Sequence, residues 1–119
     1  MQLHIVDDAS TEPGTMAFVE KLARMQRYRK VAIKVSRNRE NQWVAACRTL
    51  GARKAATDYV LFLDADDRLD NDYVKKAVLL LEANPRAGWA YPGTRTHGDS
   101  HLVLPAKPFS VVQLLFQFG

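Results

Sequence analysis

A dense group of aspartates follows the most apolar stretch of the chain. Residues 60–63 are all apolar, and Asp64, Asp66 and Asp67 come within the next four positions. Carboxylates this close repel one another, so a fold that holds them together needs a counter-charge. Hard divalent cations such as Mg²⁺ and Mn²⁺ take carboxylate oxygens as ligands and also neutralise a substrate diphosphate. The spacing therefore indicates a metal and phosphate site, with a capped turn and solvated loop carboxylates as the alternative.

A second acidic pair, Asp7 and Asp8, ends a short apolar segment near the beginning of the sequence. The carboxyl ends of parallel strands meet at one edge of an α/β sheet, and ligands bind there. If both apolar segments are strands of such a sheet, the two aspartate groups face a single cleft. One group can then hydrogen-bond a base or ribose while the other holds a metal ion and a diphosphate. The alternative is that this pair only caps a turn.

Hydrophobic periodicity predicts the elements that position these residues. We expect strands at residues 3–6, 31–35, 59–63, 89–91 and 102–104, with the strand at 59–63 at the centre of the sheet. Helices are expected at about 13–26, at about 42–54, from about 71 to 83, and at 110–118. This alternation predicts an α/β fold with a mostly parallel sheet, helices on both faces and a single domain over residues 1–119.

The same periodicity predicts which side chains are buried and which residues cap the helices. The first helix is expected to be capped by Ser10 or Thr11, and the third by Asp70 or Asn71. The expected buried stripes of the three helices are Phe18, Leu22 and Met25; Trp43, Cys47 and Leu50; and Val74, Ala77, Val78 and Leu81.

Composition narrows the class of protein. With 119 residues, 47% hydrophobic and 25% charged, the sequence is typical of a soluble globular domain. A net charge of +4 suits anionic ligands such as nucleotides and does not require nucleic acid. The single cysteine, Cys47, excludes an internal disulfide and indicates a reducing compartment. No apolar run approaches the roughly 20 residues that span a bilayer. We expect a cytoplasmic protein, with the inner face of a membrane as an alternative location.

Three segments together resemble the family 2 glycosyltransferases, which have the GT-A fold. They are Ile-Val-Asp-Asp-Ala-Ser-Thr at 5–11, the stretch from Glu40-Asn41 to Leu50-Gly51, and residues 56–67 with the helix that follows them. The resemblance implies that Asp8 hydrogen-bonds the nucleotide base and that Arg48 lies near the nucleotide. The donor site would then comprise Asp7, Asp8, Arg48, Asp64 and Asp66, and a Mn²⁺ or Mg²⁺ ion would bind Asp64, Asp66 and Asp67, with the last two nearest the metal.

The resemblance also implies a reaction. The donor would be a nucleotide-diphosphate sugar, most often a uridine diphosphate sugar, and the acceptor a sugar, lipid or protein hydroxyl. Attack of that hydroxyl from the opposite face inverts the anomeric centre and requires a general base. The family's base, an aspartate well after the Asp-x-Asp motif, has no counterpart here, and neither does its first apolar strand. We therefore expect a donor domain truncated at both ends and inactive alone, whose exposed sheet edges favour pairing with a second copy.

This sequence departs from the family at two further positions, because Trp43 stands where a small residue, commonly glycine, is expected, and Thr49 where asparagine is common. Two other functions stay open. A receiver domain controlled by phosphorylation also has an acidic pair, a central aspartate and a late Lys-Pro-aromatic sequence, which Asp7-Asp8, Asp64 and Lys107-Pro108-Phe109 match. Against it, no proline follows Asp64 closely. A non-catalytic nucleotide-binding module is the other alternative.

Overall fold

The chain forms two compact units, Met1–Asp67 and Arg68–Gly119, each with its own elements. The structure, a computed structural model, describes residues 1–28 and 30–108. The helix expected at 110–118 lies outside these residues, and the single domain over 1–119 stays a prediction. Within the described ranges, no helix combines the length and the apolar character that crossing a membrane requires.

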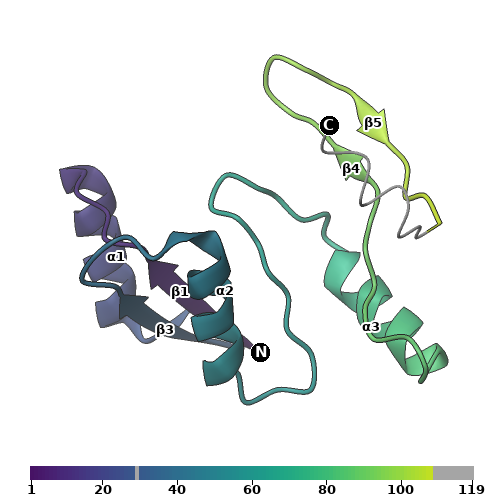
Figure 1. Ribbon diagram of the computed structural model, residues 1–119, viewed down its shortest axis with the longest axis horizontal. Coiled ribbons are helices and arrows are strands. Elements are labelled where there is room, and N and C mark those ends of the chain that lie inside the picture. The colour runs from purple at the N-terminus through teal and green to yellow at the C-terminus, as the bar shows by residue number, and fades with distance from the viewer. Residues whose placement is uncertain (29, 109–119) are drawn as a thin grey trace. The chain divides into compact units, whose positions relative to one another are not determined.

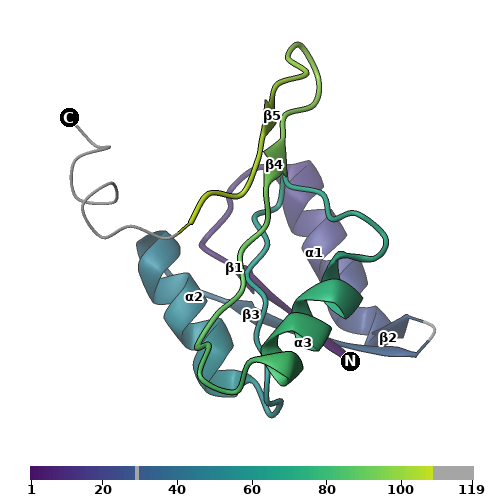
Figure 2. The ribbon, with the colours of Figure 1, turned by 90° about the vertical axis from the view of Figure 1, so that its right-hand side faces the viewer.

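The first unit is a small α/β sheet. Its elements are β1 (Gln2–Asp7), α1 (Pro13–Met25), β2 (Arg27–Tyr28), β3 (Val31–Arg37) and α2 (Trp43–Lys54). The strand order is β1-β3-β2, with β1 and β3 parallel and β2 antiparallel to β3. Helix α1 packs on β3 and α2 packs on β1, on opposite faces of the sheet (Figure 1, Figure 2). The parallel pair and the helices on both faces are confirmed, whereas β2 was not predicted.

The centre of this unit lies in β3. Ile33 is 7% exposed and is the only buried hydrophobic residue in the described part of the chain. It lies opposite Leu3 in the parallel register, on the row that ends with Asp7 opposite Arg37. Alternate residues point to opposite faces of a sheet, so the other row of β1 faces α2, where Val6 approaches Gly51. The sheet therefore carries Asp7 and Asp8 at the carboxyl end of β1.

The two helices of this unit form where they were predicted, but their faces differ from the expectation. In α1, Met16, Val19 and Leu22 are half-buried, whereas Phe18 is 59% and Met25 37% exposed, so the predicted stripe was wrong at Phe18 and Met25. In α2, Trp43 is exposed instead of joining the stripe. Each helix turns toward the sheet those residues that fit the surface of the sheet. The hydrophobic spacing within a helix does not specify which residues these are.

The N-terminus of α1 is capped by a residue that we did not predict. Glu12, rather than Ser10 or Thr11, is the N-cap, and its carboxylate accepts the backbone N–H groups of Gly14 and Thr15. Proline follows at the first helical position, as expected. The longer glutamate side chain reaches the same unpaired donors that a shorter cap would satisfy, and its negative charge suits this end of the helix dipole.

The predicted central strand at residues 59–63 is wrong for this structure. The segment is not a strand, and the side chains of Val60, Leu61, Phe62 and Leu63 are 46–49% exposed. A strand exists only where a neighbour exchanges backbone hydrogen bonds with it. Among the described residues, β1 pairs with β3 alone, and no strand pairs with residues 59–63. The apolar run is present, but its partner in a sheet is not.

Between residues 68 and 108 the second unit holds one helix and one hairpin, namely α3 (Tyr73–Ala83), β4 (Thr94–Arg95) and β5 (Val103–Leu104). The N-cap of α3 is Asp72, without a side-chain cap, rather than Asp70 or Asn71. Strands β4 and β5 pair antiparallel. The strand predicted at 89–91 is wrong, because strand pairing begins only at Thr94, and the Trp89 and Tyr91 rings meet edge to face instead.

A polar network ties the end of α2 to the sheet. His4 Nε2 lies 3.0 Å from Ser36 Oγ, and Lys54 Nζ donates to the same oxygen at 2.8 Å. His4 Nδ1 is buried and has no hydrogen-bond partner among the described residues. Burial, followed by the charges of Lys54 and Lys34, lowers the pKa of His4. The folded chain therefore favours the neutral imidazole.

This network predicts a loss of stability in mild acid. Because the pKa of His4 is lower in the folded chain, the unfolded chain binds more protons below about pH 6.5. The free energy of unfolding should thus fall as the pH decreases from about 7 toward the folded pKa, and stay level above about 7. Urea unfolding across this range checks the prediction. His4→Gln should flatten the dependence and His97→Gln should retain it, whereas equal slopes for wild type and His4→Gln would contradict it.

Candidate functional site

Asp7 and Asp8 are adjacent but have different environments. Asp7 is 5% exposed, at the end of β1. Its Oδ1 accepts the Ser10 N–H at 3.1 Å, and its Oδ2 lies 3.1 Å from Arg37 Nε in an ion pair without hydrogen-bond geometry. Arg37 also donates to the Ser10 carbonyl at 2.7 Å. Asp7 therefore anchors the loop after β1, and its expected contact with a donor stays a prediction.

Asp8 instead connects this loop to the start of α2. Its Oδ1 accepts Asn38 Nδ2 at 2.7 Å and the Gln42 N–H at 2.8 Å, while its Oδ2 accepts the Trp43 N–H at 2.8 Å. The hydrogen bond from Asn38, then that from Gln42, lowers the pKa of Asp8. A carboxylate offers about four acceptor positions, and these three bonds together with the hydrogen bond from the Cys47 thiol fill them, so a ligand reaches this carboxylate by replacing one of these donors.

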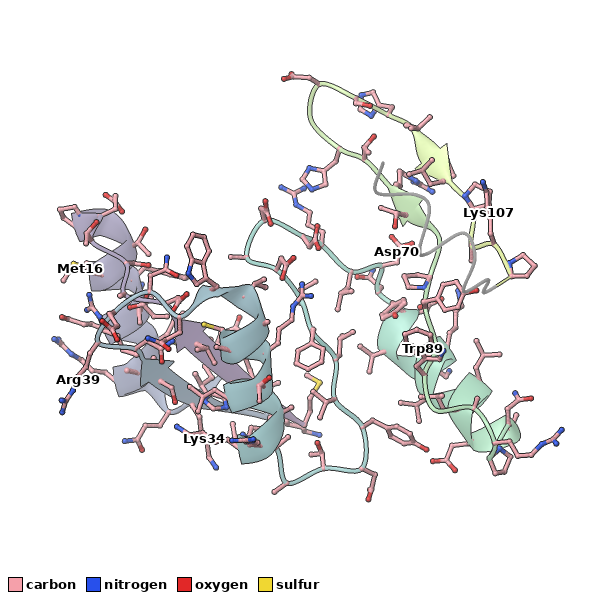
Figure 3. The ribbon with its side chains drawn as sticks, in the orientation of Figure 1. Met16, Lys34, Arg39, Asp70, Trp89 and Lys107 are labelled. Carbon is pink, nitrogen blue, oxygen red and sulfur yellow. The ribbon has the colours of Figure 1, made fainter. Side chains whose placement is uncertain are left out.

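Asn38 is a residue that sequence reasoning missed. It lies just after β3, its backbone N–H donates to the Asp7 carbonyl at 2.9 Å, and its side chain also approaches Cys47 Sγ at 3.4 Å. The same loop carries Arg39, which points away from the sheet (Figure 3) and is exposed. The only signal in the sequence was a polar amide directly after a predicted strand, which is common in loops.

Cys47 is half-buried beside this network, as its place in the helical stripe predicted. Burial, followed by the hydrogen bond and the negative charge of Asp8, raises the pKa of the thiol. The thiol is therefore protonated at neutral pH and is a poor nucleophile. Its position fits a small packing residue under the start of α2.

Arg48 and Asp64 were both predicted for the site, and the structure brings them together. Arg48 Nη2 donates to Asp64 Oδ1 at 2.8 Å and lies 3.0 Å from Oδ2. The guanidinium carbon of Arg48 lies 5.9 Å from the centre of the Phe62 ring. Both charged groups are exposed, so the pair contributes at most about 1 kcal/mol to stability. Its effect is to fix the start of the aspartate cluster against α2.

Asp66 and Asp67 lie in a turn that begins at Asp64. The Asp67 N–H donates to the Asp64 carbonyl at 3.1 Å, and both side chains are exposed. Within residues 1–28 and 30–108, no three side chains of the ligating types converge closely enough to hold a metal ion. Oxygen donors of this kind suit a hard cation, but Arg48 holds the oxygens of Asp64. The metal role of these three aspartates stays a prediction.

The two aspartate groups share α2 as a common support. Asp8 bonds the first residue of the helix, and Asp64 bonds Arg48 five residues later. At a rise of about 1.5 Å per residue, these two attachment points are about 7.5 Å apart along the helix axis. Two groups that are far apart in the sequence are thus held along one short helix, which is a suitable spacing for a base and a diphosphate.

Comparison with known proteins identifies the family. The model of glycosyl transferase family 2 matches residues 1–109. The chain is 31% identical to an uncharacterized glycosyltransferase of Haemophilus influenzae, over 87% of this chain and 34% of that protein. It is also 31% identical to hyaluronan synthase 3 of Gallus gallus, over 97% of this chain and 21% of that protein. No solved structure gives a significant match. The chain thus spans about a third or less of these relatives, and it belongs to glycosyl transferase family 2.

Proposed function

We propose that this chain is the donor-binding part of a glycosyltransferase and that it binds a nucleotide-diphosphate sugar along α2. The observation that carries the proposal is the attachment of Asp8 and Asp64 to the same helix. Membership of the family supports sugar transfer as the reaction class. The positive net charge of +4 also suits an anionic donor.

Each proposed role follows from a contact. The Asp8 carboxylate would hydrogen-bond the base, which we take to be uracil, in place of one of its present donors. Arg48 would exchange Asp64 for the diphosphate, since a guanidinium binds phosphate oxygens through two parallel hydrogen bonds. Asp66 and Asp67, which are exposed, would hold a Mn²⁺ or Mg²⁺ ion together with Asp64 once Arg48 turns to the diphosphate.

The proposed chemistry is the cleavage of the bond between the sugar and the diphosphate. Negative charge develops on the leaving diphosphate, and a bound cation supplies positive charge there. Arg48 adds a second positive charge, so this end of α2 favours the transition state over the ground state. An acceptor hydroxyl that attacks from the opposite face gives its proton to a general base and forms the new glycosidic bond as the bond to the diphosphate breaks, which inverts the anomeric centre.

The receiver-domain alternative is less well supported. It requires a phosphoacceptor aspartate with an accessible carboxylate, and Asp64 is its candidate. In the structure, Arg48 donates to both oxygens of that carboxylate. The family match also spans the entire region from Asp7 to Lys107 that suggested a receiver.

Calorimetric titration of uridine diphosphate tests this proposal. We expect binding in Mn²⁺ that weakens about 10-fold or more without the metal, because uncompensated carboxylates then face the diphosphate. Asp66→Asn should weaken binding in Mn²⁺ by a similar factor, since an amide is a poorer ligand for a hard cation.

Asp58→Asn is the matched control, because Asp58 is exposed and lies in the same unit outside the proposed site. It should bind uridine diphosphate as the wild type does. Equal heats with and without Mn²⁺, and equal heats for wild type and Asp66→Asn, would reject the metal-assisted donor site.

A further inference from the structure

Trp43 presents a large aromatic surface beside Asp8. Its side chain is 76% exposed, among the most exposed large hydrophobic side chains of the described residues. Its backbone N–H donates to Asp8 Oδ2 at 2.8 Å and to Asn41 Oδ1 at 2.9 Å. The backbone of Trp43 is therefore anchored at Asp8 while its indole is exposed.

Neither packing nor backbone preference explains a tryptophan at this position. The exposed indole adds almost nothing to the core. The backbone φ of Trp43 is +67°, a conformation that is costly for a bulky residue and that glycine adopts without strain. A smaller residue at this position would thus leave the folded chain at least as stable. What remains is a flat, exposed apolar ring on a residue whose backbone bonds Asp8 of the proposed donor site.

We infer that Trp43 stacks on the base of the bound nucleotide and so determines part of the affinity for the donor. This inference rests on the proposed function and names a contact within it. Every nucleobase has a flat π-face, and stacking on an aromatic side chain is a common way to bind it. Asp8 would bond the edge of the base while the indole covers its face. The Trp43 backbone already bonds this carboxylate, so the residue lies close to the proposed contact with the base.

The experiment compares two ligands that differ in the base. Uridine diphosphate and inorganic pyrophosphate are titrated in Mn²⁺ into wild type, Trp43→Gly and Trp43→Phe. We expect Trp43→Gly to weaken uridine diphosphate about 10-fold, because one stacking contact is lost. Pyrophosphate affinity should not change, and Trp43→Phe, which keeps an aromatic ring, should retain most of the affinity for uridine diphosphate. Thermal unfolding should show Trp43→Gly at least as stable as wild type, since glycine removes the strain at this φ.

Tryptophan fluorescence gives an independent readout. The sequence has two tryptophans, so Trp89→Phe leaves Trp43 as the source of the tryptophan emission. Uridine diphosphate should quench this emission and pyrophosphate should not.

Equal affinity of wild type and Trp43→Gly for uridine diphosphate would overturn the inference. So would an equal loss for both ligands, which would mean that the change acts on the fold. If wild type binds pyrophosphate and uridine diphosphate with equal affinity, the donor site stands and the stacking contact fails. If wild type binds neither ligand, the proposed function itself fails.

Discussion

Ile33→Ala should destabilise the chain more than any other single truncation in the sheet. The side chain is 7% exposed in the middle strand, between β1 and β2, with α1 packed on β3. Its removal leaves a cavity under α1, and such truncations cost about 2–5 kcal/mol. A unit of this size typically has a free energy of unfolding of about 3–10 kcal/mol. Urea unfolding followed by far-ultraviolet circular dichroism should show a large loss, with much of the sheet unfolded at ambient temperature.

Two variants show whether burial causes this effect. Ile33→Val removes one methylene group and should cost only about 0.5–1.5 kcal/mol. Leu3→Ala removes a larger group than Ile33→Val does, from the position in β1 that is paired with Ile33. Because the Leu3 side chain is 47% exposed, this change should cost less than Ile33→Ala. If Leu3→Ala were as damaging as Ile33→Ala, the core of this unit would not lie at β3.

The apolar spacing within a segment correctly predicted those helices and strands that depend on that segment alone. The strands at β1 and β3 and the helices α1, α2 and α3 all occur where apolar spacing placed them. The segment at 59–63 was wrong because four apolar residues show that a strand could be buried, not that a partner strand is available. The antiparallel strand β2 was missed for the converse reason, since two polar or aromatic residues gain strand geometry only from their pairing with β3.

The residues of the candidate site also divide into those that the sequence could predict and those that it could not. Asp8, Arg48 and Asp64 could be selected from residue type and spacing, and the structure attaches all three to α2. Asn38 could not, because its role exists only once β3 places it beside Asp8, 30 residues away in the sequence. The positive φ of Trp43 was also invisible, since a tryptophan gives no sign of a backbone conformation that glycine prefers.

Asp8→Asn should impair both the fold and the proposed donor site. The amide keeps one oxygen acceptor, but its NH₂ group faces a backbone N–H donor, so either Gln42 loses its partner or Trp43 keeps only Asn41. Loss of a charged group at this end of α2 should lower the melting temperature by about 4–8 °C. Loss of a charge-assisted hydrogen bond to the base should weaken uridine diphosphate about 10-fold or more.

The pH dependence of this variant separates the two effects. Because hydrogen bonds lower the pKa of Asp8 in the folded chain, its stabilising contribution is complete above about pH 3.8 and is lost as the pH falls through the folded value. The difference in melting temperature between wild type and Asp8→Asn should therefore be constant near neutral pH and shrink in stronger acid. Asn38→Ala, which removes one of the donors to Asp8, should lower stability and leave the Asp8 charge available to the base. If Asp8→Asn lowers the melting temperature while uridine diphosphate binds as before, Asp8 only caps α2, and the base must be bound elsewhere.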